Sequence, residues 1–265
     1  RSEGVIRELL AAGLSLEDRD DSGWTPLNAL RAAGDDAETA LERVRLFIRL
    51  GADVNATYDR GYTIFMSAVG AMERDVGILR ALVEGGANPH AVSELGYNVF
   101  HAAIDVDFGA NEEESVRETL TYLREIGVDI EHRNNAGETP LARAINDGTE
   151  TEVRVLLELG ADPNCRASIC KDGACYSAGA PAVISAVGDP EKLALLIKHG
   201  ADPRVTDEDG RTALSYAREL LAEAVAKEDA NSEWHQTWID RLHLSIQMLE
   251  NALGGASDEH QPRER

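Results

Sequence analysis

Gly51-Ala52-Asp53-Val54-Asn55 is one copy of a segment that decides the fold, because related segments recur along the chain. The other clear copies share its glycine and its position after a leucine-rich amphipathic stretch, and they begin at Gly86, Gly127, Gly160 and Gly200. A degraded copy begins at Gly13. Self-similarity of this kind is the signature of a repeat architecture, in which similar units stack on one another.

A second glycine follows most copies at a spacing of 10, as in the pairs Gly51 and Gly61 or Gly127 and Gly137. The exception is Gly160, which is 19 residues before Gly179. Helix-start signals follow the second glycine in Thr25-Pro26-Leu27, Thr139-Pro140-Leu141 and, more weakly, Thr212-Ala213-Leu214. Threonine caps a helix through its hydroxyl, and proline suits the first helical position, where no N–H is needed. The first glycine suits a left-handed cap that ends the preceding helix.

These G-x-T-P-L and L-L-x-x-G-A-D copies resemble the ankyrin repeat family over about residues 4–253. The resemblance implies an all-α solenoid of six stacked helix-turn-helix units, each with a short β-hairpin finger. We expect a partial unit at the N-terminus and a helical cap at the C-terminus. The predicted single domain, 1–253, has units at about 1–22, 23–60, 61–95, 96–136, 137–178, 179–209 and 210–253, followed by a disordered tail at 254–265.

Both ends of the repeat array have their own pattern. Gly4–Ala12 resembles the second helix of a unit whose first helix is absent, so we expect a missing N-terminal cap. Thr212–Val225 predicts a long helix. A second amphipathic helix is marked by a stripe whose members recur every three or four positions: Trp234, Trp238, Leu242, Ile246, Leu249 and Leu253. We interpret both tryptophans as part of a capping core.

The fifth finger carries the largest insertion, Cys165 to Ala178, and all 3 cysteines of the chain. Lys171-Asp172-Gly173-Ala174 is a turn signal, which favours a protruding hairpin with Cys170 and Cys175 facing each other. We predict a disulfide between these two residues, which would place the protein in an oxidising compartment such as a periplasm. Three reduced thiols in a cytoplasmic protein are the alternative. A metal site lacks a fourth ligand and a common zinc spacing.

The net charge of −22 bears on the class of partner. It argues against a nucleic-acid-binding face and against docking on anionic lipid. No apolar run approaches the roughly 20 residues of a membrane helix. A protein partner with a basic contact patch is favoured, with the chain a monomer when free. Acidity that serves only solubility or a salty habitat remains the alternative. A long insertion at Phe108–Ser115 is also acidic, and reads either as a solvated loop or as a partner contact.

Catalytic motifs are missing from the sequence, which has no G-x-S-x-G, H-E-x-x-H or Gly-rich phosphate loop. We therefore predict no enzyme, no catalytic residue, no cofactor and no metal. His101 stands where ankyrin repeats usually carry a structural histidine.

The sequence evidence for binding a partner protein is stronger than the evidence for catalysis. The residue after the second glycine is Trp24, Tyr62 and Tyr97 in three successive units, then Glu138, Ala180 and Arg211. The resemblance places this position on the fingers, where partners bind, and aromatic residues are favoured interface anchors. The alternative is that each ring packs on the neighbouring finger and stiffens it. The remaining predicted partner-binding residues lie at nearby finger and helix-end positions: Asp21, Asp59, Arg60, Glu94, Asp105 and Asp147.

The sequence therefore predicts a non-catalytic protein-binding module with an acidic, aromatic-striped concave face. An inhibitor or immunity-type protein that occludes a toxic enzyme is the first hypothesis. A scaffold, adaptor or secreted effector that binds several proteins is the second, and an enzyme using the cysteine finger is a remote third.

Overall fold

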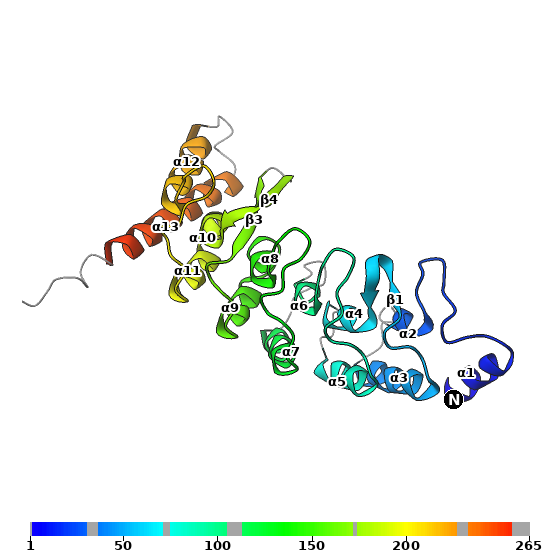
Figure 1. The fold of residues 1–265 in the computed structure, drawn as a ribbon. Helices are drawn as coiled ribbons and strands as arrows, with labels where there is room; N and C mark the ends of the chain where they lie inside the picture. The colour runs from blue at the N-terminus through cyan, green and yellow to red at the C-terminus, as the bar shows by residue number, and fades with distance from the viewer. Residues whose placement is uncertain are drawn as a thin grey trace, which may run out of the picture. The chain divides into compact units, whose positions relative to one another are not determined.

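The computed structural model describes residues 2–30, 37–70, 75–104, 113–171, 174–226 and 233–255 (Figure 1). The chain divides into two compact units, Arg1–Asn135 (unit 1) and Ala136–Arg265 (unit 2). The predicted all-α ankyrin-repeat solenoid is confirmed in both, because short first helices alternate with longer second helices. Within the described residues no helix is long and apolar enough to cross a bilayer.

Unit 1 begins with α1 (Ser2–Ala11), which confirms the predicted N-terminal helix. Its first helices are α2 (Pro26–Ala29), α4 (Ile64–Gly70) and α6 (Val99–Ala102), and its second helices are α3 (Ala37–Leu50), α5 (Val76–Glu84) and α7 (Glu113–Glu125). Figure 1 shows the two kinds of helix in separate rows. The rows bury a common core, in which Phe65, Leu79, Phe100 and Leu120 are at most 1% exposed.

Unit 2 continues the pattern with α8 (Pro140–Asn146), α9 (Glu150–Glu158), α10 (Ala182–Ser185) and α11 (Pro190–Lys198), and ends with α12 (Ala213–Ala226) and α13 (Glu233–Gly255). A short 3₁₀ helix, η3 (Ala186–Gly188), links α10 to α11. The centre of the core of unit 2 is formed by Leu141, Leu156 and Leu193, which are fully buried. Helix α13 includes Gly254 and Gly255, the first two residues of the predicted tail, and 256–265 lie outside the described residues.

The helix caps form as the sequence predicts. The Thr25 side chain accepts from the Asn28 backbone N–H, and the Thr139 side chain accepts from that of Ala142. Pro26 and Pro140 occupy the first helical positions. Gly51 ends α3 with a φ of 92°, a left-handed conformation that residues with a Cβ rarely adopt.

The extended fifth finger is a hairpin, as predicted. Strand β3 (Arg166–Lys171) pairs antiparallel with β4 (Ala174–Pro181), and the Cα register places Cys170 opposite Cys175. The register shifts between Ala167 and Ile169, so a pairing irregularity separates the base of the hairpin from its tip.

The C-terminal helix buries part of the predicted stripe, together with two polar residues outside it. Trp234 is 73% exposed, so its assignment to a capping core is wrong, whereas the neighbouring His235 is buried and its Nε2 lies 2.9 Å from the Ala224 carbonyl oxygen. Leu242 and Leu249 are fully buried, as predicted. Ser245 is buried too, and it donates to the Val187 carbonyl oxygen at 2.7 Å. The face of α13 is therefore set partly by carbonyl groups that need a donor, which hydropathy does not register.

Candidate partner-binding surface

The tip of a regular finger is held by the side chain four positions before the predicted contact residue. In the first finger, Asp20 Oδ1 accepts from the backbone N–H groups of Ser22 and Trp24, both at 2.9 Å. The same position is filled by Ser93, whose Oγ accepts from the Tyr97 N–H at 3.1 Å. A short polar side chain here closes the turn locally, as in an Asx-turn. Trp24 and Tyr97 are therefore presented from rigid turns.

The second finger departs from this pattern because Tyr58 occupies the capping position. Tyr58 pairs with Tyr62 in a short antiparallel ladder of β1 (Thr57–Tyr58) and β2 (Tyr62–Thr63). Between these strands the chain makes a 3₁₀ turn in which Arg60 has a φ of 53°. Positive φ is uncommon for residues other than glycine, so the ladder holds a strained tip in place.

Tyr58 also joins the predicted aromatic residues into one group, which we call the aromatic cluster: Trp24, Tyr58 and Tyr62. The Trp24 and Tyr58 rings meet edge to face with centroids 5.7 Å apart, and Tyr58 and Tyr62 are 6.4 Å apart. The Tyr58 hydroxyl is hydrogen-bonded to the Ser67 hydroxyl. The sequence analysis missed Tyr58. The signal that could have revealed it is an aromatic residue at the capping position, where other fingers carry Asp or Ser. All three residues remain partly exposed.

Tyr97 belongs to a separate arrangement. Its ring stacks on His101 with centroids 5.3 Å apart and an interplanar angle of 2°. His101 is fully buried, and its Nδ1 lies 2.8 Å from Asn98 Oδ1, which fits the predicted structural role. The predicted aromatic stripe is thus two groups. The ring contacts agree with stiffening of the fingers, and the partial exposure of Trp24, Tyr62 and Tyr97 leaves surface for a partner.

Hydrogen bonds tie successive fingers of unit 1 to one another. Arg19 Nη1 donates to the carbonyl oxygens of Gly23 and Thr57, both at 2.7 Å. The Glu94 N–H donates to the Arg60 carbonyl at 2.9 Å, and the Asn135 N–H donates to the Leu95 carbonyl at 3.0 Å. The fingers therefore form a coupled surface, so little conformational entropy is lost when a partner binds.

Acidic side chains stand beside these rings. Asp21, Asp59 and Glu94 are all exposed, and within the described part of the chain no ion pair joins them to a cation. Arg60 is exposed at the tip of the second finger. We call the aromatic cluster, Tyr97 and these four residues the unit 1 finger surface. This surface combines three exposed acids and one exposed arginine with four partly exposed aromatic rings.

The predicted residues of unit 2 have different surroundings. Glu138 is partly exposed. Asp147 is exposed at the end of α8, with its Oδ2 3.8 Å from Arg143 Nη1. Asp105, a predicted residue of unit 1, lies outside the described residues.

Arg211 is largely occupied within its own finger. Its Nη2 lies 2.8 Å from Asp207 Oδ2 and 2.9 Å from Asp209 Oδ2, and its guanidinium is 5.1 Å from the centre of the Tyr216 ring. Asp207 occupies the capping position of this finger and accepts from the Arg211 backbone N–H at 2.8 Å. Burial raises the pKa of Asp207, but the hydrogen bonds from Arg211 outweigh it and lower that pKa overall. The charge of Arg211 is therefore largely engaged by acids of its own finger, and the main role of this residue is to stabilise that finger.

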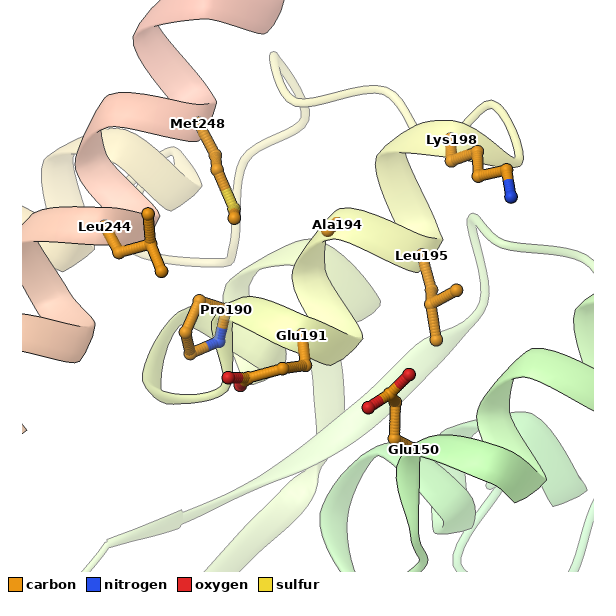
Figure 2. Close-up of a pocket in the computed structure, with 8 residues that line it drawn as sticks. All are labelled: Glu150, Pro190, Glu191, Ala194, Leu195, Lys198, Leu244 and Met248. Carbon is orange, nitrogen blue, oxygen red and sulfur yellow. The ribbon is translucent and has the colours of Figure 1, made fainter. Parts of the chain in front are cut away.

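A shallow groove of about 320 Å³ lies in unit 2 where α9, α11 and α13 meet (Figure 2). Figure 2 shows Leu244 and Met248 of α13 directed toward α11, with Glu150 of α9 below Leu195. Glu150 pairs with Arg154 at 3.2 Å, and Glu191 pairs with Arg241 at 3.0 Å. The groove thus offers apolar surface with a largely neutralised rim and no nucleophile beside a base. Sequence reasoning did not find it.

Within the part of the chain that the structure describes, no group of three or more His, Cys, Asp or Glu side chains is suited to hold a metal ion.

Comparison with known proteins agrees with the geometry. The ankyrin repeat domain of human ASB11 superposes with a TM-score of 0.60 and 20% identity, covering 91% of this chain and 93% of that one. The ankyrin repeat domain of Bcl-3 gives a TM-score of 0.59 and 24% identity, covering 91% of each chain. This chain has the ankyrin-repeat fold. No family model matches its sequence.

Sequence similarity is more limited than the similarity in fold. The ankyrin-repeat chain is 29% identical over 212 residues to the B-cell lymphoma 3 protein homolog of Mus musculus, which covers 78% of this chain and 44% of that protein. It spans less than half the length of each of the first curated relatives that it matches. The comparisons therefore establish the repeat fold and leave the partner to be inferred from the surface.

Proposed function

We propose that this chain is a protein-binding module without catalysis, and that its unit 1 finger surface binds a basic patch on a partner protein. The observation that carries the proposal is the combination of exposed acids and partly exposed rings on fingers that are hydrogen-bonded to one another. Aromatic residues supply contact area with few rotatable bonds, and complementary charge speeds encounter and excludes wrong partners.

We propose further that the chain acts as an inhibitor or immunity-type protein, which occludes the active site of a single toxic enzyme. The net charge of −22 supports this proposal, because a strong field accelerates association with a basic enzyme. The fixed finger tips support it as well, since a surface already in its bound shape loses little entropy and can bind tightly.

An adaptor that holds several proteins weakly is the second candidate. It is supported by the relatives, which are longer proteins that match this chain over only part of their own length. The two candidates differ in the number and the affinity of their partners.

The test is affinity capture from the cell of origin with two tagged baits. One bait is the natural chain, and the other carries Asp21→Asn, Asp59→Asn and Glu94→Gln. Bound proteins are eluted with rising salt and identified by mass spectrometry.

The inhibitor proposal expects one dominant basic enzyme that is lost from the neutralised bait and released as salt rises. It also expects that the purified enzyme loses activity when the chain is added. Several weakly held proteins on the natural bait would favour the adaptor. Equal capture by both baits would overturn the assignment of the finger surface.

The remote enzymatic alternative has its own test. A chain in which all three cysteines are replaced by serine keeps its partner and its inhibitory effect under our proposal. An activity of the chain that disappears in this variant while binding persists would support catalysis by the cysteine finger.

A further inference from the structure

The fifth finger places two of the three cysteines opposite each other. In the Cα register of β3 and β4, Cys170 pairs with Cys175 and Lys171 pairs with Ala174, across a two-residue connection. We infer that Cys170 and Cys175 form a cross-strand disulfide that locks the tip of this finger. The inference does not depend on the proposed function.

The backbone separation of opposite residues suits this bond. Directly opposite residues in an antiparallel ladder have Cα atoms about 4.5 or 5.5 Å apart, depending on whether the pair is hydrogen-bonded. Disulfides join residues whose Cα atoms are about 4.4–6.8 Å apart. Either kind of pair therefore brings Cys170 and Cys175 within range without movement of the backbone.

Cys165 is excluded from pairing with either residue. It lies at the base of the hairpin, where its carbonyl accepts from the Ala182 N–H at 3.0 Å, and it is 4% exposed. Cys170 is five residues farther along β3, a distance of roughly 16 Å in an extended strand. Cys175 stands opposite Cys170 and is equally remote from the base. The three pairings that the sequence allows are thus reduced to one.

The position of the bond explains what it would do. The base of the hairpin is fixed by the pairs of Arg166 with Pro181 and Ala167 with Ala180. Beyond the irregularity, the described residues form three pairs, and the central pair is Cys170 with Cys175. A short two-stranded hairpin is marginally stable in water, so an unlinked tip would open readily. The disulfide fixes the register of the tip and presents a preformed finger.

The chemistry is a thiol–disulfide exchange with a small-molecule disulfide such as oxidised glutathione. One cysteine thiolate attacks the glutathione disulfide and releases one glutathione thiolate, which takes up the proton of the attacking thiol. The second cysteine then attacks the mixed disulfide and releases the second glutathione. The cysteine pair loses two electrons and two protons, and glutathione disulfide gains them. The bond persists in an oxidising compartment such as a periplasm.

Tryptic mapping of the full chain tests the inference directly, because cleavage after Arg166, Lys171 and Lys192 puts each cysteine on its own peptide. The chain is equilibrated with oxidised and reduced glutathione, remaining thiols are alkylated, and monomer from a non-reducing gel is digested. We expect the peptide 167–171 linked to the peptide 172–192, and Cys165 alkylated on 155–166 after denaturation. Reduction should separate the linked pair.

Variants and hydrogen exchange complete the test. Cys165→Ser should leave the linked pair unchanged, whereas Cys170→Ser and Cys175→Ser should each abolish it. Amide exchange across Ile169–Tyr176 should be slower in the oxidised chain than in the reduced one. The inference is overturned if the oxidised monomer yields Cys170 and Cys175 separately alkylated, or if Cys165 is the linked residue. A link found only in dimers would overturn it as well.

Discussion

Tyr58 stands directly opposite Tyr62 in the second finger and contacts Trp24 of the first, so one side chain joins the rings of two fingers. At the equivalent position other fingers use Asp20, Ser93 or Asp207 to close their own turns. A local cap has been replaced here by contact between neighbouring fingers. The second finger should therefore be more sensitive to loss of this side chain than to changes at its exposed tip.

Tyr58→Ala should lower the free energy of unfolding by about 1–3 kcal/mol, because two ring contacts and the bond to Ser67 are lost. Tyr58→Phe keeps the rings and should lower it by about 0.5–1.5 kcal/mol. Urea denaturation monitored by tryptophan fluorescence measures both. Asp59→Ala, at the exposed tip of the same finger, serves as the control and should change stability by less than about 0.5 kcal/mol. Equal effects of Tyr58→Ala and Asp59→Ala would contradict the bridging role.

The second prediction concerns the exposed faces of the aromatic rings on the unit 1 finger surface. Trp24→Ala, Tyr62→Ala and Tyr97→Ala should each weaken binding of the captured partner by about 1–3 kcal/mol, as truncation of aromatic anchors does. Isothermal titration with purified partner measures the change, and circular dichroism checks that the variants fold. Trp234→Ala removes a ring that is 73% exposed on α13, and we expect it to leave affinity unchanged. Unchanged affinity in all three finger variants would show that the rings only stiffen the fingers.

Charge should act mainly on the rate of association. The variant with Asp21→Asn, Asp59→Asn and Glu94→Gln should associate more slowly and show a weaker dependence on salt, whereas dissociation changes less. Stopped-flow mixing at several salt concentrations measures this. A matched control carries Glu8→Gln, Glu42→Gln and Glu118→Gln, which remove the same charge from exposed positions on α1, α3 and α7. Equal slowing in both variants would mean that net charge, and not the finger surface, steers the partner.

Local signals explain why most of the fold could be predicted from the sequence. Thr25 and Pro26 start a helix through contacts within one turn, and Gly51 ends one through its own backbone freedom. The turn signal at 171–174 likewise predicts the hairpin because register follows from the turn. Each of these features depends on residues that are neighbours in the sequence.

Features that depend on distant residues were missed or misassigned. Trp234 fits the apolar period of α13, yet His235 faces the core because it reaches the Ala224 carbonyl. The groove of Figure 2 joins Glu150, Leu195 and Leu244 from three helices, and no single stretch of sequence marks it. Arg211 looks like a surface cation in the sequence but is engaged by Asp207 and Asp209.

The pair of Asp207 and Arg211 should make unit 2 sensitive to acid. The folded-state pKa of Asp207 is lowered from 3.8, so the unfolded chain binds the proton more readily. The carboxylate therefore stabilises the fold fully above about pH 4, and this stabilisation is lost as pH falls through the lowered pKa. Asp207→Asn should be less stable than the natural chain at pH 7, and the difference should shrink below pH 4.

Urea titrations at a series of pH values measure this difference. Asp209→Asn is the matched control, because Asp209 contacts the same guanidinium at 2.9 Å but its side chain is 74% exposed. It should change stability little at any pH, since an exposed pair contributes little. A constant difference between the natural chain and Asp207→Asn from pH 7 to pH 3 would contradict the assigned role of the Asp207 charge.

Lys192 gives the last prediction, because it is a nearly buried ammonium that closes the end of another helix. Its Nζ donates to the carbonyl oxygens of Ala144, Ile145 and Gly148 at 3.1, 2.9 and 2.7 Å. These groups lie at the C-terminal end of α8, where carbonyls lack helical partners and a cation is favoured. Lys192→Met keeps the length of the side chain and leaves the three carbonyls without this donor. It should lower the free energy of unfolding by about 1–3 kcal/mol at pH 7.

The pH dependence distinguishes charge from packing at this site. Burial lowers the pKa of Lys192 below 10.5, and attraction to Asp189 and other acids only partly offsets the effect. The unfolded chain then binds the proton more readily, so this lysine makes stability rise with pH between its folded-state pKa and 10.5. Lys192→Met lacks that rise, and the gap between the two proteins should widen in alkaline solution. Lys198→Met, on the exposed side of α11, is the control and should follow the natural chain throughout. A gap that stays constant up to pH 10.5 would mean that Lys192 acts through packing alone.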